Sequence, residues 1–341
     1  VESFVQFVDF APTILHFAGI DVPTQMDGRP FLGDNISNDE FEERTTAFSY
    51  ADRFDEKYDF VRALRKGKYK YVRNYQPFNI DGLFNYYRYK MLSFREWEEL
   101  YRQGKLNAAQ EQFFLPRSPE ALYDLEKDPD EVNNLVNDPD YNQILLTLRS
   151  DLHDQVASMP DLSFIPEPYF IKKGIDNPVE FGQGHKEDIT QYLAIADLTL
   201  LSIEEASSGI QEALSSENPW SRYWGLIVCS SFEQKAASFY DHARKLSISD
   251  PEPINRMRAF EFLVLSGQDV SQDEVINLID RATSESEANL MLNSVALMET
   301  VRPDFDITIP RSIFPADWLD QPGDLVNRRV DFINGQAIFE N

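Results

Sequence analysis

The sequence has little of the residue types on which cross-links and metal centres depend. A single cysteine, Cys229, occurs in 341 residues, which excludes a framework of internal disulfides. The four histidines show none of the i+3 or i+4 pairing that a helical zinc site uses. No Gly-x-Ser-x-Gly or Walker motif is present. The sequence therefore predicts neither a zinc centre nor either of these two kinds of catalytic loop.

Long apolar runs and positive charge are also scarce. No run of about 18 or more apolar residues occurs, so the sequence predicts no membrane-spanning helix. The formal net charge of −26 disfavours nucleic acid or an anionic membrane as the main partner. Residues 44–117 depart from this balance, with 15 Lys and Arg against 9 Asp and Glu. This basic island either serves an anionic small substrate or is a hairpin exposed to water, and the sequence favours neither.

What is present is the composition of a globular protein, arranged in four successive parts. Hydrophobic residues make up 42% of the chain and aromatic residues 13%, which suffices for a sizeable core. Residues 1–160 mix strand and helix patterns, and residues 161–187 form a Pro/Gly-rich, irregular connector. Residues 188–305 carry helical repeats, and the tail 306–341 caps the last of them. The predicted class is α+β, with an antiparallel hairpin or sheet and helices followed by an all-α domain.

Local signals place several elements in the first part. Asp9 suits a helix N-cap, Pro12 falls in the first turn, and Gly19 suits the position just after the helix. This helix is so apolar that we expect sequence preceding the chain to cover it, so that the chain begins in mid-domain. Alternating residues on both sides of Lys66-Gly67 predict an antiparallel hairpin.

A run of alternating acids between Asp124 and Asp130 raises the question of a calcium loop, whose ligands are spaced in this way. An EF-hand counted from Asp124 would need Gly where Pro129 stands and Glu where Leu135 stands. Both requirements fail. The sequence predicts instead a strand over 121–125, a turn over 128–130 and a helical segment from 131.

The second half of the chain repeats its helix signals. Pro219 and Pro253 open similar segments with a period of 34 residues, which is typical of a HEAT-like solenoid of about three repeats. An irregular helical bundle is the alternative. A Ser-x-x-Glu or Ser-x-x-Gln pattern predicts a helix start at each of four serines, which are Ser202, Ser231, Ser271 and Ser284.

Three stretches resemble, in family order, the C-terminal part of the formylglycine-dependent (type I) sulfatases. They are SFVQFVDFAPTILHFAGIDVPTQMDGRPFL (3–32), VRALRKGKYKYVRNYQPF (61–78) and ALYDLEKDPDEVNNLVNDPDY (121–141). The resemblance covers about residues 1–155 and is nearest to the heparan N-sulfatase (N-sulfoglucosamine sulfohydrolase) branch. It makes the acidic run a joint that closes the fold rather than a metal site.

The resemblance implies an alkaline-phosphatase-like fold and hydrolysis of sulfate esters or sulfamates, with a sulfated glycan or another small sulfated compound as substrate. It also implies a formylglycine made from Cys or Ser in Cys/Ser-x-Pro-x-Arg, and a calcium ion. Cys229 lacks the Pro and Arg of that motif. We therefore expect no catalytic or metal-binding residue in this chain, and both cofactors on residues upstream of it. The expected partners are the N-terminal sulfatase portion and a second copy of the chain, and the family is typical of periplasmic, secreted or lysosomal proteins.

The part present could still supply a pocket wall. In the similar N-sulfatases the region around Arg53 approaches the sugar, and an Arg suits a sulfate or carboxylate while an Asp suits hydroxyl groups. The alternative is a surface loop with compensating charges. A different reading of the whole chain is a scaffold whose helical repeats bind a protein partner. The predicted substrate-binding residues are Tyr50, Asp52, Arg53, Lys57 and His185.

Overall fold

The computed structural model describes residues 3–320 and 324–336. These residues form two compact units that alternate along the chain. The first unit comprises residues 3–51, 61–73 and 120–155, and the second comprises residues 52–60, 74–119 and the described residues from 156 onward. The sequence predicted four consecutive parts, divided at residues 160, 187 and 305, whereas each unit combines segments that are not consecutive. The predicted divisions stay predictions.

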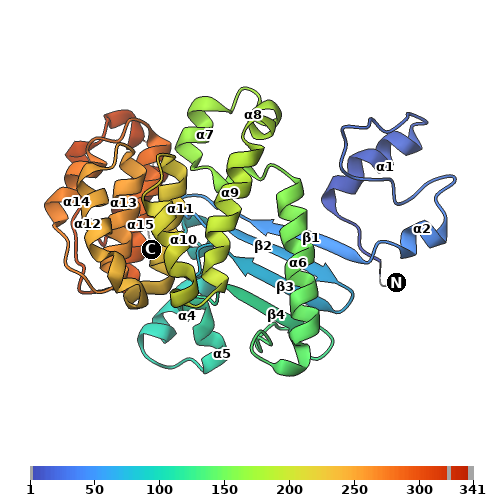
Figure 1. Ribbon diagram of the computed structural model, residues 1–341, viewed down its shortest axis with the longest axis horizontal. Helices are drawn as coiled ribbons and strands as arrows, with labels where there is room; N and C mark the ends of the chain where they lie inside the picture. The colour runs from blue at the N-terminus through green and yellow to red at the C-terminus, as the bar shows by residue number, and fades with distance from the viewer. Residues whose placement is uncertain (1–2, 321–323, 337–341) are drawn as a thin grey trace. The chain divides into compact units, whose positions relative to one another are not determined.

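The first unit is built on a four-stranded sheet in the order β1-β2-β3-β4, with β1 (Thr46–Ala51), β2 (Val61–Lys66), β3 (Tyr69–Asn74) and β4 (Glu120–Asp124). The predicted hairpin is confirmed, and Gly67 at its turn has a φ of +57°, which glycine adopts without strain. Helix α6 (Asn142–Ser158) crosses the sheet (Figure 1). Arg149 on α6 bonds Glu120 on β4 at 2.9 Å, and Lys66 pairs with Asp151 at 2.8 Å.

The segment after β4 differs from its prediction. Residues 131–135 are not helical, so the helical segment predicted from residue 131 is wrong. The side chain of Asn134 accepts from the backbone N–H of Leu122 at 3.0 Å and donates to the carbonyl of Glu120 at 3.2 Å. The N–H of Leu135 adds a bond to the carbonyl of Leu122 at 2.8 Å. The segment is therefore held in a non-helical conformation by its hydrogen bonds to β4.

The N-terminal segment of the first unit contains η1 (Phe7–Asp9), α1 (Phe10–Phe17) and α2 (Asn38–Glu42). Asp9 stands at the N-cap position of α1, but its carboxylate caps nothing there. It is buried, accepts from Arg44 at 2.9 Å and accepts from the backbone N–H of Arg29 at 3.0 Å. A Cβ on Gly28 would lie 2.0 Å from the carbonyl oxygen of Val8, so this close approach requires glycine.

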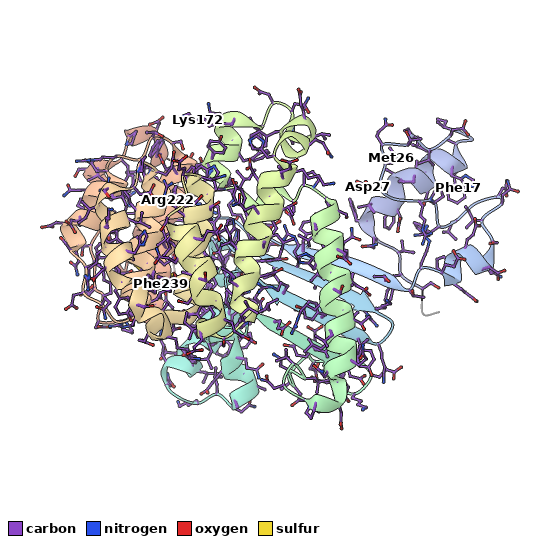
Figure 2. All side chains as sticks on the ribbon, in the orientation of Figure 1. Phe17, Met26, Asp27, Lys172, Arg222 and Phe239 are labelled. Carbon is purple, nitrogen blue, oxygen red and sulfur yellow. The ribbon has the colours of Figure 1, made fainter. Side chains whose placement is uncertain are left out.

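The apolar side of this segment faces solvent in the chain described. Phe7 is 90% exposed, and Ile14 and Phe17 are each 66% exposed (Figure 2 labels Phe17). The apolar helix is thus uncovered within the described residues, and the expectation that sequence outside the chain covers it stays a prediction. The His16 side chain is half-buried and its Nε2 bonds the carbonyl of Asp34 at 2.7 Å.

We expect the 341-residue chain to bind an apolar-surface dye and to self-associate, because exposed apolar patches of this kind promote association. Replacing Phe7 and Phe17 together by serine should reduce both effects, as measured by dye fluorescence and light scattering. Val179, an isolated residue that is 74% exposed on another helix, provides the matched control Val179→Ser, which should change neither. A parent chain that is monomeric and binds no dye would contradict the prediction.

The second unit begins with short helices, α3 (Tyr86–Tyr89), α4 (Leu92–Arg102) and α5 (Ala108–Glu111). Gly104, two residues after the end of α4, has a φ of +63°, which glycine adopts without strain. The prediction of an irregular connector over 161–187 is wrong, because this stretch contains α7 (Glu167–Lys173) and α8 (Pro178–Gly184). Both helices have proline in the first turn, where its missing N–H has no helical partner to lose, so these prolines start helices instead of breaking them.

The rest of the second unit is helical. Its helices are α9 (Lys186–Ala196), α10 (Ile203–Leu214), α11 (Pro219–Phe232), α12 (Tyr240–Ser249), α13 (Pro253–Leu265), α14 (Gln272–Ile279), α15 (Glu285–Val301) and α16 (Leu325–Ile333). Helices α11, α13 and α15 lie next to one another, and each packs against the helix before it (Figure 1). Within the described ranges, none of the helices has the length and apolar character needed to span a bilayer.

The four predicted helix starts have different outcomes. Ser202 forms the complete capping box with Glu205. Ser271 and Ser284 each accept the expected helix N–H, although the carboxylate of Glu287 bonds Thr283 instead of returning to Ser284. The start predicted at Ser231 is wrong, since this residue lies inside α11 and its hydroxyl donates to the carbonyl of Ile227. The HEAT-like interpretation of these helices stays a prediction.

Candidate functional site

A tight turn carries three of the predicted substrate-binding residues, Asp52, Arg53 and Lys57. Residues 52–60, here called the 52–60 loop, reverse direction through paired backbone bonds between Phe54 and Lys57, at 2.8 and 3.0 Å. Asp55 within the turn has a φ of +51°. The side chain of Asn85, which is 1% exposed, donates to the carbonyl of Phe54 at 2.6 Å. These bonds give the loop a defined conformation.

Two helices far along the chain also hold the 52–60 loop. Asn293 on α15 accepts from the backbone N–H of Tyr58 at 3.0 Å. Arg329 on α16 is fully buried and donates to the carbonyl of Glu56 at 3.0 Å and to Asn293 at 2.9 Å. Hydrogen bonds to Asn85, Asn293 and Arg329 therefore hold the backbone of the 52–60 loop, so its conformation is set before any ligand binds.

The loop borders a cavity of about 210 Å³. The apolar part of its wall combines side chains from the loop, from residues 162–170 and from α15. The polar part carries both signs of charge and two phenol groups. The apolar residues are Phe60, Leu162, Ile165, Pro166, Phe170 and Leu290, and the polar ones are Asp52, Arg53, Tyr58, Asp59, Gln76, Ser163, Glu167, Tyr223 and Arg258.

Arg53, Tyr58 and Glu167 form one connected group at this cavity, here called the Arg53–Tyr58–Glu167 group. Arg53 pairs with the carboxylate of Glu167 at 3.3 Å, and the Tyr58 hydroxyl donates to the same oxygen, Oε2. The Arg53 guanidinium also lies over the Tyr58 ring, 5.8 Å from its centroid. The side chains of Arg53 and Glu167 are 35% and 28% exposed, so the group is accessible to solvent.

Burial raises the pKa of Tyr58, and the negative charge of Glu167 raises it further. Tyr58 therefore keeps its proton over the whole physiological range and acts as a hydrogen-bond donor to Glu167. Oε2 of Glu167 accepts from both neighbours, whereas its other oxygen, Oε1, makes no hydrogen bond with the described residues. That oxygen is an acceptor available to a ligand.

Asp59, Arg117 and Lys57 form a second, buried group of charged side chains. Arg117 donates to the two carboxylate oxygens of Asp59 at 2.6 and 3.0 Å, and Lys57 lies 3.3 Å from the same carboxylate. Burial alone would raise the pKa of Asp59, but the two cations outweigh it and lower this pKa to about 2. Burial lowers the pKa of Lys57, against the opposing effect of Asp59. Asp59 is thus ionised and held by its neighbours.

The far wall of the cavity contains a charge pair within α13. Arg258 is 2% exposed, pairs with Glu261 at 2.7 Å and donates to the Tyr223 hydroxyl at 2.9 Å. The guanidinium also lies 5.1 Å from the centre of the Tyr223 ring. Both the charge and the donors of Arg258 are largely used inside the protein.

The structure separates the five predicted substrate-binding residues. Asp52 and Arg53 line the cavity, whereas Lys57 belongs to the buried charged group that it forms with Asp59 and Arg117. Tyr50 lies on β1 in the first unit, 72% exposed and under the guanidinium of Arg62. His185 follows α8, where its ring lies 4.1 Å from that of Phe181, and it is not among the cavity residues. Their roles in binding stay predictions.

Of the residues that line the cavity, only Asp52 and Arg53 were predicted from the sequence, so Tyr58, Glu167 and Arg258 are among those that were not. Glu167 lies 114 residues from Arg53 along the chain, in the stretch that was expected to be irregular. Its position in the first turn of α7, next to prolines, was the only local signal, and that signal concerns helix formation rather than binding.

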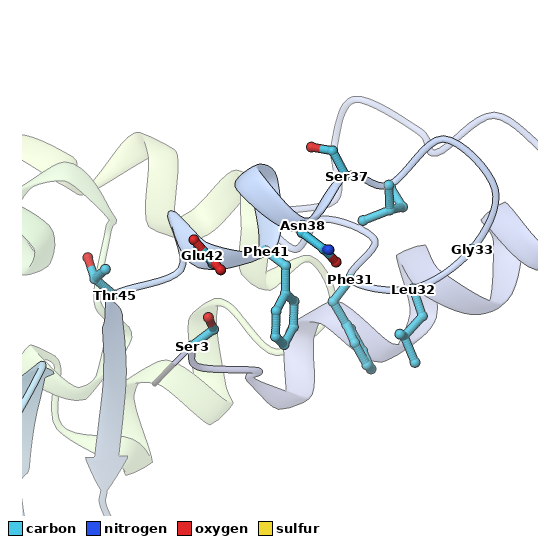
Figure 3. Close-up of a pocket in the computed structure, with 10 residues that line it drawn as sticks. Ser3, Phe31, Leu32, Gly33, Ser37, Asn38, Phe41, Glu42 and Thr45 are labelled. Atoms are coloured by element: carbon cyan, nitrogen blue, oxygen red, sulfur yellow. The ribbon is translucent and has the colours of Figure 1, made fainter. Parts of the chain in front are cut away.

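The first unit has a larger hollow, of about 820 Å³, along the N-terminal segment (Figure 3). Its lining has one charged residue, Glu42, together with the rings of Phe31 and Phe41, which point to the same side in Figure 3. The smaller cavity, in contrast, has charged groups of both signs in its wall, so it is the candidate site.

The described residues contain no group of three or more His, Cys, Asp or Glu side chains that could hold a metal ion. The residues present therefore do not fit the calcium ion that the resemblance implies. Cys229 does not fit a modified nucleophile either. It is completely buried in α11, and burial raises the pKa of its thiol.

Sequence comparison relates the chain to two curated proteins from Formosa agariphila, each named ulvan-active sulfatase. One is 38% identical over 170 residues, which are 50% of this chain and 28% of that protein. The other is 25% identical over 190 residues, 51% of this chain and 33% of that protein. The chain thus spans about a third or less of the length of these relatives. No protein-family model matches it.

Among solved structures, the chain is similar to that of a proposed sulfatase from Bacteroides thetaiotaomicron VPI-5482. The identity is 22%, the match covers 44% of this chain and 24% of the other, and the TM-score is 0.26. The sequence relatives support the sulfatase family for the matched half of the chain. The nearness to heparan N-sulfatases stays a prediction.

Proposed function

We propose that the chain is the C-terminal part of a sulfatase that hydrolyses sulfate esters or sulfamates of a glycan. The observation that carries the proposal is the 38% identity to an ulvan-active sulfatase over half of the chain. Hydrolysis transfers the sulfuryl group from the sugar oxygen or nitrogen to water and releases sulfate. In this proposal the chain closes the fold and lines the sugar side of the pocket through the cavity beside the 52–60 loop.

The nucleophile and the metal are assigned to sequence outside this chain. In the family that the chain resembles, formylglycine supplies the nucleophile and calcium neutralises sulfate charge. Since the described residues offer no ligand set for the metal and Cys229 is buried, no step of the proposed reaction involves this chain's own residues as catalyst. Their proposed contribution is binding and orientation.

The proposal predicts that the full-length protein releases sulfate from a sulfated glycan such as ulvan, whereas the 341-residue chain alone releases none. The full-length protein would be produced together with a formylglycine-generating enzyme, and sulfate would be measured by ion chromatography. An aryl sulfate serves as a second substrate that lacks the sugar. The matched control is the full-length protein with the Cys or Ser of its Cys/Ser-x-Pro-x-Arg motif changed to Ala.

Two outcomes would refute this proposal. One is an upstream sequence without that motif, together with no sulfate release from any substrate, which would favour a helical scaffold that binds a protein partner. The other is turnover of the aryl sulfate by the purified 341-residue chain, which would require a nucleophile within it.

A further inference from the structure

We propose that the cavity beside the 52–60 loop binds an uncharged sugar ring, and that Glu167 determines this specificity by neutralising Arg53. The inference rests on the proposed function, because that function makes the ligand a glycan. It assigns the cavity to a sugar unit next to the one whose sulfate is removed. It also gives Arg53 a role different from the one predicted from the sequence, where its charge was expected to meet an anionic group.

The charge balance of the cavity disfavours an anion. Each arginine in the wall already faces a carboxylate, Arg53 at Glu167 and Arg258 at Glu261. Asp59 is matched in turn by Arg117 at 2.6 Å and by Lys57 at 3.3 Å, and Arg117 also pairs with Asp81 at 3.3 Å. An entering carboxylate or sulfate would therefore meet acidic groups without an uncompensated cation, which raises the free energy of the complex.

The same groups suit the hydroxyl groups of a neutral sugar. Oε1 of Glu167 can accept a hydrogen bond, while Arg53 uses only one of its nitrogens, Nη1, in the bond to Glu167. Hydrogen bonds to ionised groups are the stronger kind, and a sugar hydroxyl can both donate and accept. The Arg53–Tyr58–Glu167 group therefore presents an acceptor and donors side by side.

The remaining wall suits the C–H face of a sugar ring. Phe60, Phe170 and Leu290 contribute apolar surface from three different segments, and Tyr58 adds an aromatic ring. A volume of about 210 Å³ corresponds to about seven water molecules at ~30 Å³ each, which is room for one sugar ring and not for a chain of them. Shape, apolar surface and polar groups thus agree on a single uncharged ring.

The role of Glu167 can be tested through a gain of affinity. The probes are glucose, glucuronate and glucose 6-sulfate, which share one ring and differ in the group at its sixth carbon. Dissociation constants for the 341-residue chain would be measured by NMR titration. We expect glucose to bind at least several-fold more tightly than either anionic sugar.

Glu167→Gln should reverse this order. The amide can still accept from Tyr58, but it no longer neutralises Arg53, so we expect the ratio of glucuronate to glucose affinity to rise at least about tenfold. Glucose 6-sulfate distinguishes a general gain for anions from one specific to carboxylates. Glu187→Gln, at an exposed position of α9, is the matched control and should leave the ratio as in the parent.

Arg53→Gln tests the inference from the opposite direction and remains informative if Glu167→Gln does not fold. It leaves Glu167 without its cation, so the ratio of glucuronate to glucose affinity should fall below that of the parent. A purely structural role for either residue would change both affinities together and leave the ratio constant. Tighter binding of an anionic sugar by the parent, or a ratio that neither variant alters, would overturn the inference.

These measurements separate the inference from the proposed function. Preferential binding of glucose without sulfate release by the full-length protein would refute the sulfatase activity alone. Sulfate release by a protein whose cavity prefers glucuronate or glucose 6-sulfate would refute the neutral-sugar site alone.

Discussion

Arg329→Met should lower the free energy of unfolding by about 3–5 kcal/mol, because it removes a buried cation that donates to three buried acceptors. Arg329 is 0% exposed and donates to the carbonyls of Glu56 and Phe84 and to the side chain of Asn293. Methionine has a similar length but no donor, so these buried acceptors would lose their partner, at about 1–3 kcal/mol for each unsatisfied group. The measurement is a urea titration of the parent and the variant.

Arg281→Met provides the matched control, because Arg281 is exposed at the end of α14 and should contribute less than about 0.5 kcal/mol. Burial raises the pKa of Glu56, and the positive charge of Arg329 opposes this rise. Arg329→Met removes that charge, so the pKa of Glu56 should rise further in this variant. A midpoint for Arg329→Met within the error of the control would show that the 52–60 loop does not depend on α16.

Elements set by local chemistry could be predicted from the sequence. The hairpin followed from alternation around Gly67, and the end of α1 followed from Gly19, whose φ is +68°. Ser202 and Glu205 satisfy each other's backbone within four residues, so their signal is complete in the sequence. In each case the decisive contacts lie within one turn or one hairpin.

Elements set by distant partners could not be predicted in this way. The stretch around Asn134 reads as a helix start by composition, but its side chain completes the edge of β4. The pattern at Ser231 resembles a cap, although the helix begun at Pro219 simply continues through it. A contact with another segment decided the first outcome, and the continuing helix decided the second; local propensity was the weaker influence in both.

The candidate site shows the same limit. Asp52 and Arg53 could be selected because their residue types suit a sugar and an oxyanion. What the sequence did not reveal is that Glu167 neutralises Arg53, since this contact joins residues 114 positions apart. The chemical consequence is large, because a neutralised arginine no longer favours an anionic ligand. Site residues can thus be proposed from their type, but their net charge depends on tertiary contacts.

Arg117→Met should destabilise the second unit by about 3–5 kcal/mol at pH 5, because removing one partner of a buried ion pair leaves the other uncompensated. Arg117 is 13% exposed and supplies the shortest contact of Asp59. The pKa of Asp59 is about 2 in the folded protein and 3.8 for an aspartate without these interactions. The ionised carboxylate therefore stabilises the folded protein fully above pH 3.8, and this stabilisation is lost as pH falls through 2. In the variant this pKa rises, so the difference between the two proteins should narrow by about 1 kcal/mol at pH 3.

The double variant Arg117→Met/Asp59→Asn separates the loss of the ion pair from the cost of the charge left behind. With the carboxylate gone, Lys57 and the amide remain, and we expect the double variant to be more stable than Arg117→Met by about 1–2 kcal/mol. Urea titrations of the parent, both single variants and the double variant at pH 5 and pH 3 give the complete cycle. A double variant no more stable than Arg117→Met would mean that the carboxylate of Asp59 is hydrated from the cavity, which it lines, and does not depend on Arg117 for its charge.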